Sequence, residues 1–332
     1  MAKRKSRKSK RSKMANSNPA QLDLLYSWTP DTSSGGTSTS TTQFIDLARD
    51  LSRANRRFYE QNRNYVVRGI TYLFPGTAQP GSIGSVGAYT AANNWCVQNA
   101  HVKGEAMWHE MNQLVLEDNP SIMGRWAGFR LRMSTSMVVA NTLDPLAGDG
   151  ATPLGAGEWD YSKYVMPQHE VDPATGLPLP ADELTPVLIG GDGSLTRSLV
   201  KAYEESRATV QPIDPSVPAG MSTSFFNLLT DSGSQEPELA DLIEDDNDQP
   251  PYDQANYPQG GGNNIYPIIV DGAAASNEQP IGRIGSFIAP CGLIQLSANI
   301  VTNINDEAQT IGVIVHVAPG DYKGTMSVPM GQ

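Results

Sequence analysis

The chain has 332 residues and a formal net charge of −11, and charged side chains make up only 18% of it. With 31 glycines and 24 prolines, the composition favours a β-rich body with long loops over a helical bundle. Cys96 and Cys291 lie far apart in the sequence, which argues against a disulfide scaffold and indicates a reducing compartment. No apolar run approaches the roughly 18 residues of a membrane span, so we expect no membrane partner.

The net charge hides a strongly basic N-terminus. Residues 3–13 contain no acidic and no apolar side chain, and eight of them are basic: Lys3, Arg4, Lys5, Arg7, Lys8, Lys10, Arg11 and Lys13. The rest of the chain carries 16 basic and 35 acidic residues. A segment that cannot bury anything is expected to stay disordered until it meets a polyanion. We therefore predict that this basic arm binds nucleic acid through phosphates, without sequence preference; a nuclear-import signal or a solubilising tail is the alternative.

Two regions are predicted from these features. Residues 1–40 are expected to form the disordered basic arm and a Ser/Thr/Gly linker, and residues 41–332 one folded domain. Within the first region, residues 14–30 include an apolar patch, QLDLLYSW, which could dock onto the body or onto a neighbouring subunit.

The first half of the body mixes helical and strand-like patterns. Residues 42–61 are predicted as an amphipathic helix capped by Thr41 or Thr42. A strand is expected at 64–74, then a glycine-rich loop at 76–87 and a strand at 95–102; periodicity does not decide between helix and strand at 104–118. Residues 125–140 are predicted as a long strand, with Phe129, Leu131 and Met133 on one face and Arg130 and Arg132 on the other.

The second half ends in the most strand-like sequence. Residues 141–186 are predicted as long loop with one short strand near 161–171, followed by a strand at 185–190 and a helix at 195–206 capped by Ser194. A short apolar segment at 224–230 and an acidic helix and loop at 236–264 come next. Strands are expected at 264–270, 284–302 and 310–319. Because no βαβ alternation appears, we predict an all-β fold, an antiparallel jelly-roll sandwich of about eight strands with long loops and a few short helices.

Several side-chain clusters are candidates for binding. Arg130 and Arg132 share a predicted strand face, which could meet nucleic acid, an acidic neighbour or only solvent. A second basic patch near the arm comprises Arg53, Arg56, Arg57 and Arg63. The acidic segment 236–253 could hold Ca²⁺ between subunits, although it has no EF-hand spacing and a solvated loop explains it better.

No catalytic chemistry is indicated. His101, Glu105 and His109 would share a helix face at i, i+4, i+8, but Gly104 interrupts such a helix and no third strong ligand is near in sequence. None of the catalytic or phosphate-binding motifs searched for is present. We therefore expect neither an enzyme nor a cofactor.

The layout of MAKRKSRKSKRSK, a Ser/Thr/Gly linker and a strand series ending in FIAPCGLIQLSANI and TIGVIVHVAPG resembles the capsid proteins of small circular single-stranded DNA viruses that encode a replication initiator. The resemblance covers the architecture of the whole chain. It implies an icosahedral homo-oligomer of roughly 60 or more copies, which packages a genome, expected to be single-stranded DNA, through inward-facing arms. It also implies localisation in the virion, and in the host nucleus during assembly.

Two departures from the resemblance are visible. The arm is shorter and richer in lysine than many such arms, and we cannot place the predicted helix at 42–61 in that family. Small RNA viruses with a jelly-roll shell share the layout, which leaves the nucleic-acid type open. The alternative function from another class is a nuclear, chromatin-like protein that binds nucleic acid without sequence preference.

Overall fold

The computed structural model describes residues 20–30, 32–34, 41–75, 82–124, 126–155, 157–166, 182–207, 266–302 and 309–331. The basic arm, the predicted elements at 224–230 and 236–264 and the acidic segment 236–253 lie outside these residues. Within them the fold is mostly β, with antiparallel sheets and few helices. None of the helices in these ranges combines the length and the apolar character needed to cross a membrane.

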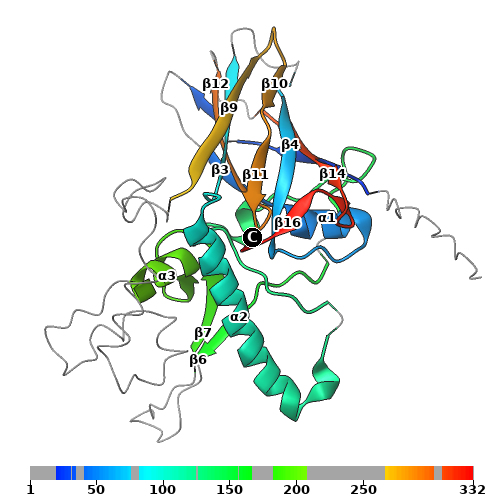
Figure 1. Cartoon of the computed structure of the whole chain (residues 1–332). Coiled ribbons are helices and arrows are strands. Elements are labelled where there is room, and N and C mark those ends of the chain that lie inside the picture. Colours follow the sequence, from blue (N-terminus) through cyan, green and yellow to red (C-terminus); the bar gives the residue numbers. More distant parts are fainter. Residues whose placement is uncertain are drawn as a thin grey trace, which may run out of the picture.

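Two sheets make up the upper half of the molecule in Figure 1. The first has the order β1 (Asp23–Trp28), β13 (Ile311–Val317), β4 (Arg63–Leu73) and β10 (Ile281–Ile284), with β11 (Phe287–Pro290) and β16 (Ser327–Pro329) also paired with β4. The second has the order β2 (Thr32–Ser34), β12 (Leu293–Thr302), β5 (Ile83–Thr90) and β9 (Ile268–Ser276), with β3 (Thr41–Asp46) also paired with β12. The β2–β12 pair is parallel, and the other pairs of these two sheets are antiparallel.

The antiparallel pairs are nested along the chain. β1 pairs with β13, β3 with β12, β4 with both β10 and β11, and β5 with β9. The chain is therefore one long hairpin whose two halves pair from the ends inward. The first and third pairs join edge to edge through β13 and β4, and the second and fourth through β12 and β5. This alternation distributes the hairpin over two sheets.

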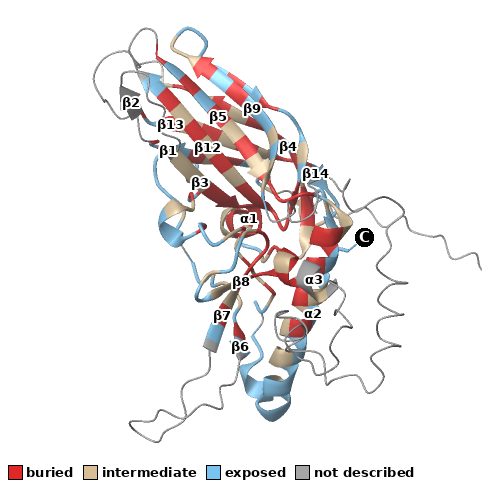
Figure 2. Ribbon diagram, turned by 90° about the vertical axis from the view of Figure 1, so that its left-hand side faces the viewer, coloured by how far each residue is buried: buried red, intermediate tan, exposed pale blue. Residues whose placement is uncertain are grey.

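One hydrophobic cluster fills the space between the sheets, and it follows from period-2 alternation in the strands. Buried side chains come from β1, β4, β5, β12 and β13, among them Leu24, Tyr26, Trp28, Val67, Tyr72, Val86, Leu296, Ala298, Ile300, Val313 and Val315. Figure 2 shows these buried positions as bands that alternate with less buried ones along the strands. The alternation predicted for β12 is confirmed, since its buried residues alternate with half-buried Gln295, Ser297 and Asn299.

Between β5 and β9 the chain builds a second part, below the sheets in Figure 1. Its elements are α2 (Trp95–Asp118), η1 (Pro120–Ile122), η2 (Val139–Asn141), β6 (Tyr164–Met166), β7 (Asp182–Val187), β8 (Thr196–Ser198) and α3 (Leu199–Arg207). β6 and β8 flank β7, and the β7–β8 pair is parallel. A second hydrophobic cluster joins α2 and α3 to Phe44 of β3 and Leu293 of β12. After β13, β14 (Pro319–Gly320) and β15 (Gly324–Thr325) form a small hairpin.

The N-terminal boundary differs from the prediction. β1 and β2 lie within the first 40 residues, which the sequence assigned to arm and linker. Leu24, Tyr26 and Trp28 are buried in the core, because β1 pairs with the central strand β13. The apolar patch QLDLLYSW, residues 21–28, therefore docks onto the body of its own chain.

Two helices begin later than predicted. Residues 42–61 form β3 followed by the short helix α1 (Leu47–Asn55), capped by Asp46 rather than by Thr41 or Thr42. At 195–206, strand β8 precedes α3, and Ser198 rather than Ser194 accepts a hydrogen bond from the α3 backbone. In both places residues that were predicted to be helical form a strand instead, because they pair with a neighbouring strand: β3 with β12, and β8 with β7.

Three further predictions for the first half are wrong. Residues 95–102 are the start of α2, which runs through Gly104 without interruption. Gly104 suits this helix because a Cβ there would lie 2.9 Å from Leu199 Cδ1 of α3. Residues 83–87 belong to β5 instead of a loop. The described residues of 125–140 contain no strand; Phe129, Leu131 and Met133 are buried as expected, but only an isolated bridge joins Arg132 to Val187.

Candidate nucleic-acid interface

Helix α1 and the two residues that follow it carry four arginines: Arg49 and Arg53 in the helix, Arg56 at its C-cap and Arg57 next to the cap. Asp46 Oδ1 accepts from the backbone N–H of Arg49 at 3.1 Å, which satisfies one of the free donors of the first turn. Leu47, Ala48 and Leu51 are buried in the core between the sheets. Arg56 ends the helix in the left-handed conformation, with φ of 52°. The core face of α1 is therefore fixed, and arginines occupy much of its other side.

A buried polar network anchors α1 from below. Arg49 Nε lies 2.8 Å from Asp50 Oδ1, and the hydroxyl of Tyr26 in β1 donates to Asp50 Oδ2 at 2.8 Å. Gln61 donates to Asp46 Oδ2 at 2.8 Å and accepts from the backbone N–H of Leu131 at 2.7 Å. Burial raises the pKa of Asp50 to about 6 despite the neighbouring guanidinium. The network ties α1 to β1 and to the extended segment at 129–133.

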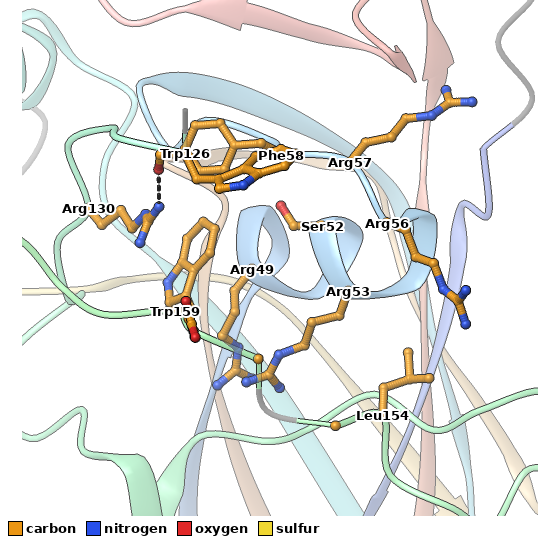
Figure 3. A pocket seen from close by; sticks show the side chains of 13 residues that line it. Arg49, Ser52, Arg53, Arg56, Arg57, Phe58, Trp126, Arg130, Leu154 and Trp159 are labelled. Atoms are coloured by element: carbon orange, nitrogen blue, oxygen red, sulfur yellow. Dashed lines mark hydrogen bonds between the residues drawn. The ribbon is translucent and has the colours of Figure 1, made fainter. Parts of the chain in front are cut away.

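A pocket of about 590 Å³ lies beside α1, where the sheets meet the loops of the second part. Its lining comes from α1 and the residues after it, and from the loops at 126–130 and 154–159: Arg49, Ser52, Arg53, Arg56, Arg57, Phe58, Trp126, Arg130, Leu154, Gly155, Gly157, Glu158 and Trp159. Figure 3 shows that the pocket has two ends. The rings of Phe58, Trp126 and Trp159 gather at one end, and Arg56 and Arg57 extend away at the other.

The aromatic end is organised around Arg130. The ring of Phe58 meets those of Trp126 and Trp159 with centroids 6.3 and 6.1 Å apart. The guanidinium carbon of Arg130 lies 4.5 Å from the Trp159 centroid and 5.1 Å from that of Phe58. Its NH groups donate to the carbonyls of Trp126 and Asp160. Arg130 therefore holds the aromatic rings and both loops together by cation–π contact and hydrogen bonds.

The cationic end holds the arginines that are available to a ligand. Arg56 and Arg57 are exposed, and neither has an ion-pair partner among the described residues. Arg53 is committed to Asp144 at 2.5 Å, and Arg49 is shared between Asp50 and Asp144. The exposed carboxylate of Glu158 is the acidic group of the lining. Arg56 and Arg57 are therefore the cations of the lining that are best able to meet phosphate oxygens.

Gln21, from which the chain leads back to the basic arm, lies at the C-terminal end of α1. The Asn55 side chain accepts from the backbone N–H of Gln21 at 2.6 Å and donates to the Gln21 carbonyl at 3.1 Å. Only seven residues separate Gln21 from Lys13, the last basic residue of the arm. At about 3.5 Å per extended residue, the arm therefore starts within reach of Arg56 and Arg57.

The structure brings together only part of the predicted basic residues. Arg53, Arg56, Arg57 and Arg130 line one pocket, although Arg130 acts as a structural clamp rather than an outward strand residue. Arg132 lies elsewhere, with its guanidinium 5.1 Å from the Tyr161 centroid. Arg63 is held by Ser327 and lies over the ring of Tyr322 at 3.7 Å. Lys3, Arg4, Lys5, Arg7, Lys8, Lys10, Arg11 and Lys13 lie outside the described residues.

Sequence reasoning missed the aromatic half of the site. Phe58 falls within the helix predicted at 42–61, Trp126 within the strand predicted at 125–140 and Trp159 within the loop predicted at 141–186. Trp126 is 56% exposed, an unusual state for so large an apolar side chain. The local signal was the pair of tryptophans in glycine-containing loops, since loops near a rigid scaffold often carry binding residues.

The histidines offer no competing metal centre. Glu105 lies 3.9 Å from His101 and 3.6 Å from His109, so the three do share one face of α2. Burial, however, lowers the pKa of His101 to about 3, and its ring packs against Phe129 with centroids 5.5 Å apart. Nowhere in the described ranges do three or more His, Cys, Asp or Glu side chains gather closely enough to hold a metal ion.

Comparison of the chain with protein-family models, with curated proteins and with solved structures found no match.

Proposed function

We propose that this protein is a viral capsid protein that self-assembles into an icosahedral shell and packages a nucleic-acid genome. The shell would contain roughly 60 or more copies, and the genome is expected to be single-stranded DNA. The protein would act in the virion, and in the host nucleus during assembly. It would need no catalytic residue and no cofactor for this role.

The strand pairing supports a jelly-roll sandwich, the finer fold on which this proposal rests. A jelly roll is an eight-strand hairpin wrapped into two sheets, with the pairs alternating between them. If β2 and β3 count as one strand, and β10 and β11 as another, the nested pairs follow this scheme. The second part, between β5 and β9, is then an insertion between the fourth and fifth strands of the sandwich.

The observation that carries the proposal is the position of Gln21, from which the chain leads back to the arm. The Asn55–Gln21 hydrogen bonds hold Gln21 at the end of α1 that is followed by the exposed Arg56 and Arg57. In a closed shell this end of α1 would face inward, toward the genome. Sixty arms would carry about 480 positive charges, so the arms and the exposed arginines would together neutralise part of a genome of phosphates.

The charge of the remaining chain suits the same arrangement. Without the arm it carries 35 acidic and 16 basic residues. Such a body repels nucleic acid from surfaces without an arginine cluster and keeps a large assembly soluble. Packaging would therefore be directed to the side that carries the arm and the pocket.

Electron microscopy of the purified protein tests the proposal. We expect closed shells of uniform diameter that contain nucleic acid. Deleting residues 2–13 should leave the fold intact and remove most of the salt-sensitive nucleic-acid uptake. Monomers or dimers that bind DNA would refute the capsid function and favour a nuclear, chromatin-like binding protein. Unchanged nucleic-acid content after the deletion would refute the role of the arm.

A further inference from the structure

The pocket beside α1 has a feature that packaging by charge alone does not require. Bulk neutralisation of phosphates needs only flexible cations, such as those of the arm. The pocket instead presents a held cluster of three aromatic rings, and it extends from these rings to two exposed arginines (Figure 3). Arg130 holds this cluster in place, because its guanidinium donates to the carbonyls of Trp126 and Asp160 and lies over the ring of Trp159.

We infer that this pocket binds one unstacked nucleotide of a single-stranded nucleic acid. The base stacks against the aromatic cluster with Trp126 as its main platform, and the neighbouring phosphate contacts Arg56 and Arg57. The inference rests on the proposed function, which it deepens by assigning the site a ligand class. Aromatic platforms combined with a basic track are the common means of binding single strands without sequence preference.

The dimensions and exposure of the site fit this ligand. A volume of about 590 Å³ lies within the range of small-ligand pockets, roughly 300–1,000 Å³. Trp126 is 56% exposed. Phe58 and Trp159 are only half-buried and flank the guanidinium of Arg130.

The aromatic cluster also predicts strand selectivity. In a duplex the faces of the bases are stacked on one another, so a base reaches an aromatic side chain only after it leaves the stack. A single strand supplies unstacked bases at little cost. The pocket should therefore favour single-stranded over double-stranded nucleic acid, whereas the arm neutralises the phosphates of both.

The loop that carries Trp126 is packed closely enough to hold the platform in place. A Cβ added at Gly128 would lie 2.7 Å from the Phe58 ring, so the loop backbone and Phe58 are in tight contact. The Arg130 guanidinium donates to the carbonyl of Trp126 itself. A held platform loses little conformational freedom when a base stacks on it.

Binding of two labelled oligonucleotides by the full-length chain tests the inference. One probe is a short oligothymidylate, and the other is an abasic strand of the same length that keeps the phosphates but lacks the bases. Fluorescence anisotropy is measured at raised salt, which weakens the phosphate contacts of the arm. We expect the wild type to bind the oligothymidylate more tightly than either the abasic strand or a duplex.

Two variants and one control separate stacking from charge. Trp126→Ala should weaken oligothymidylate binding about 5- to 150-fold and leave the abasic strand unaffected, because one base stack is lost. Trp126→Phe keeps a ring and should retain most of the affinity. The matched control is Tyr266→Ala, which truncates a 62%-exposed aromatic side chain outside the pocket and should change neither affinity.

The inference is overturned if Trp126→Ala binds oligothymidylate as tightly as the wild type, or if the wild type binds both strands equally. It is also overturned if Trp126→Phe loses as much affinity as Trp126→Ala, since then the loop and not the ring matters. Electron microscopy of the same preparations distinguishes the test of the capsid function from the test of the nucleotide pocket. A base-dependent affinity without shells would refute the capsid function alone, and shells without base dependence would refute the pocket alone.

Discussion

Replacing Asp50 by Asn should change how the stability of the protein depends on pH. Asp50 is fully buried, and burial raises its pKa from 3.8 to about 6. Because the folded state holds this proton more tightly than the unfolded state, the group stabilises the fold most below about pH 4. That contribution is lost as the pH rises through about 6. The difference between the two pKa values corresponds to about 3 kcal/mol.

The asparagine variant has no such titration, so the comparison isolates it. Between about pH 4 and pH 7, the free energy of unfolding of the wild type should fall by about 2 kcal/mol relative to Asp50→Asn, since part of the full difference is already lost at pH 4. Urea unfolding followed by tryptophan fluorescence at several pH values measures this difference.

Asp149→Asn is the matched control. Hydrogen bonds from Thr152 hold the pKa of this exposed carboxyl at about 2, so its stabilising contribution is lost only as the pH falls toward 2. The difference in free energy of unfolding between Asp149→Asn and the wild type should stay constant between about pH 5 and pH 7. A pH-independent difference for Asp50→Asn would refute the reasoning that burial outweighs the ion pair with Arg49.

Two further predictions concern the arginines and the helix contact below them. Substituting both Arg56 and Arg57 by Ala should lower the salt slope of single-strand binding by about 1.4, since each lost phosphate contact removes about 0.7. Lys163→Ala, which removes a cation that does not line the pocket, serves as the control. An unchanged slope for the double variant would show that Arg56 and Arg57 do not contact phosphates. Gly104→Ala should cost about 1–3 kcal/mol in urea unfolding, because its Cβ would lie 2.9 Å from Leu199 Cδ1, and this exceeds the gain in helix propensity of up to about 1 kcal/mol. A Gly104→Ala variant as stable as the wild type would show that Leu199 can move aside.

One buried polar network supports both ends of the pocket. The buried network of Asp46, Arg49 and Asp50 fixes α1, and through Gln61 it also fixes the start of the segment that carries Arg130. A change in this network, such as the titration of Asp50, should therefore disturb both ends of the pocket. We expect it to alter nucleic-acid binding as well as the stability of the fold.

Several parts of the fold follow from local sequence alone. The alternating and β-branched patterns predicted β4 and β13 correctly, because a period-2 pattern places one set of side chains in a core whatever its partners are. The strand predicted at 284–302 is wrong as a single element, since the chain divides there into β11 and β12 of different sheets. The concentration of eight basic residues in the arm, attached to an acidic body, is also a property of sequence.

Tertiary contacts decided the rest. Residues 129–133 alternate as a strand would, but they form an extended segment with a single bridge, from Arg132 to the end of β7 at Val187. Backbone hydrogen bonds to residues 186–189 and the side chain of Gln61 hold this segment. The β-branched and aromatic residues at 95–102 became helical, since Asn94 caps α2 and the helix buries one face against α3.

The candidate site shows the same division. The sequence alone determined a basic arm and a second basic patch of Arg53, Arg56, Arg57 and Arg63. Only the fold brought Phe58, Trp126 and Trp159 around Arg130, because these residues come from segments up to about 100 positions apart, and no local pattern encodes their meeting. The arm's chemistry is local, whereas the pocket exists only where the sheets and the second part of the chain pack together.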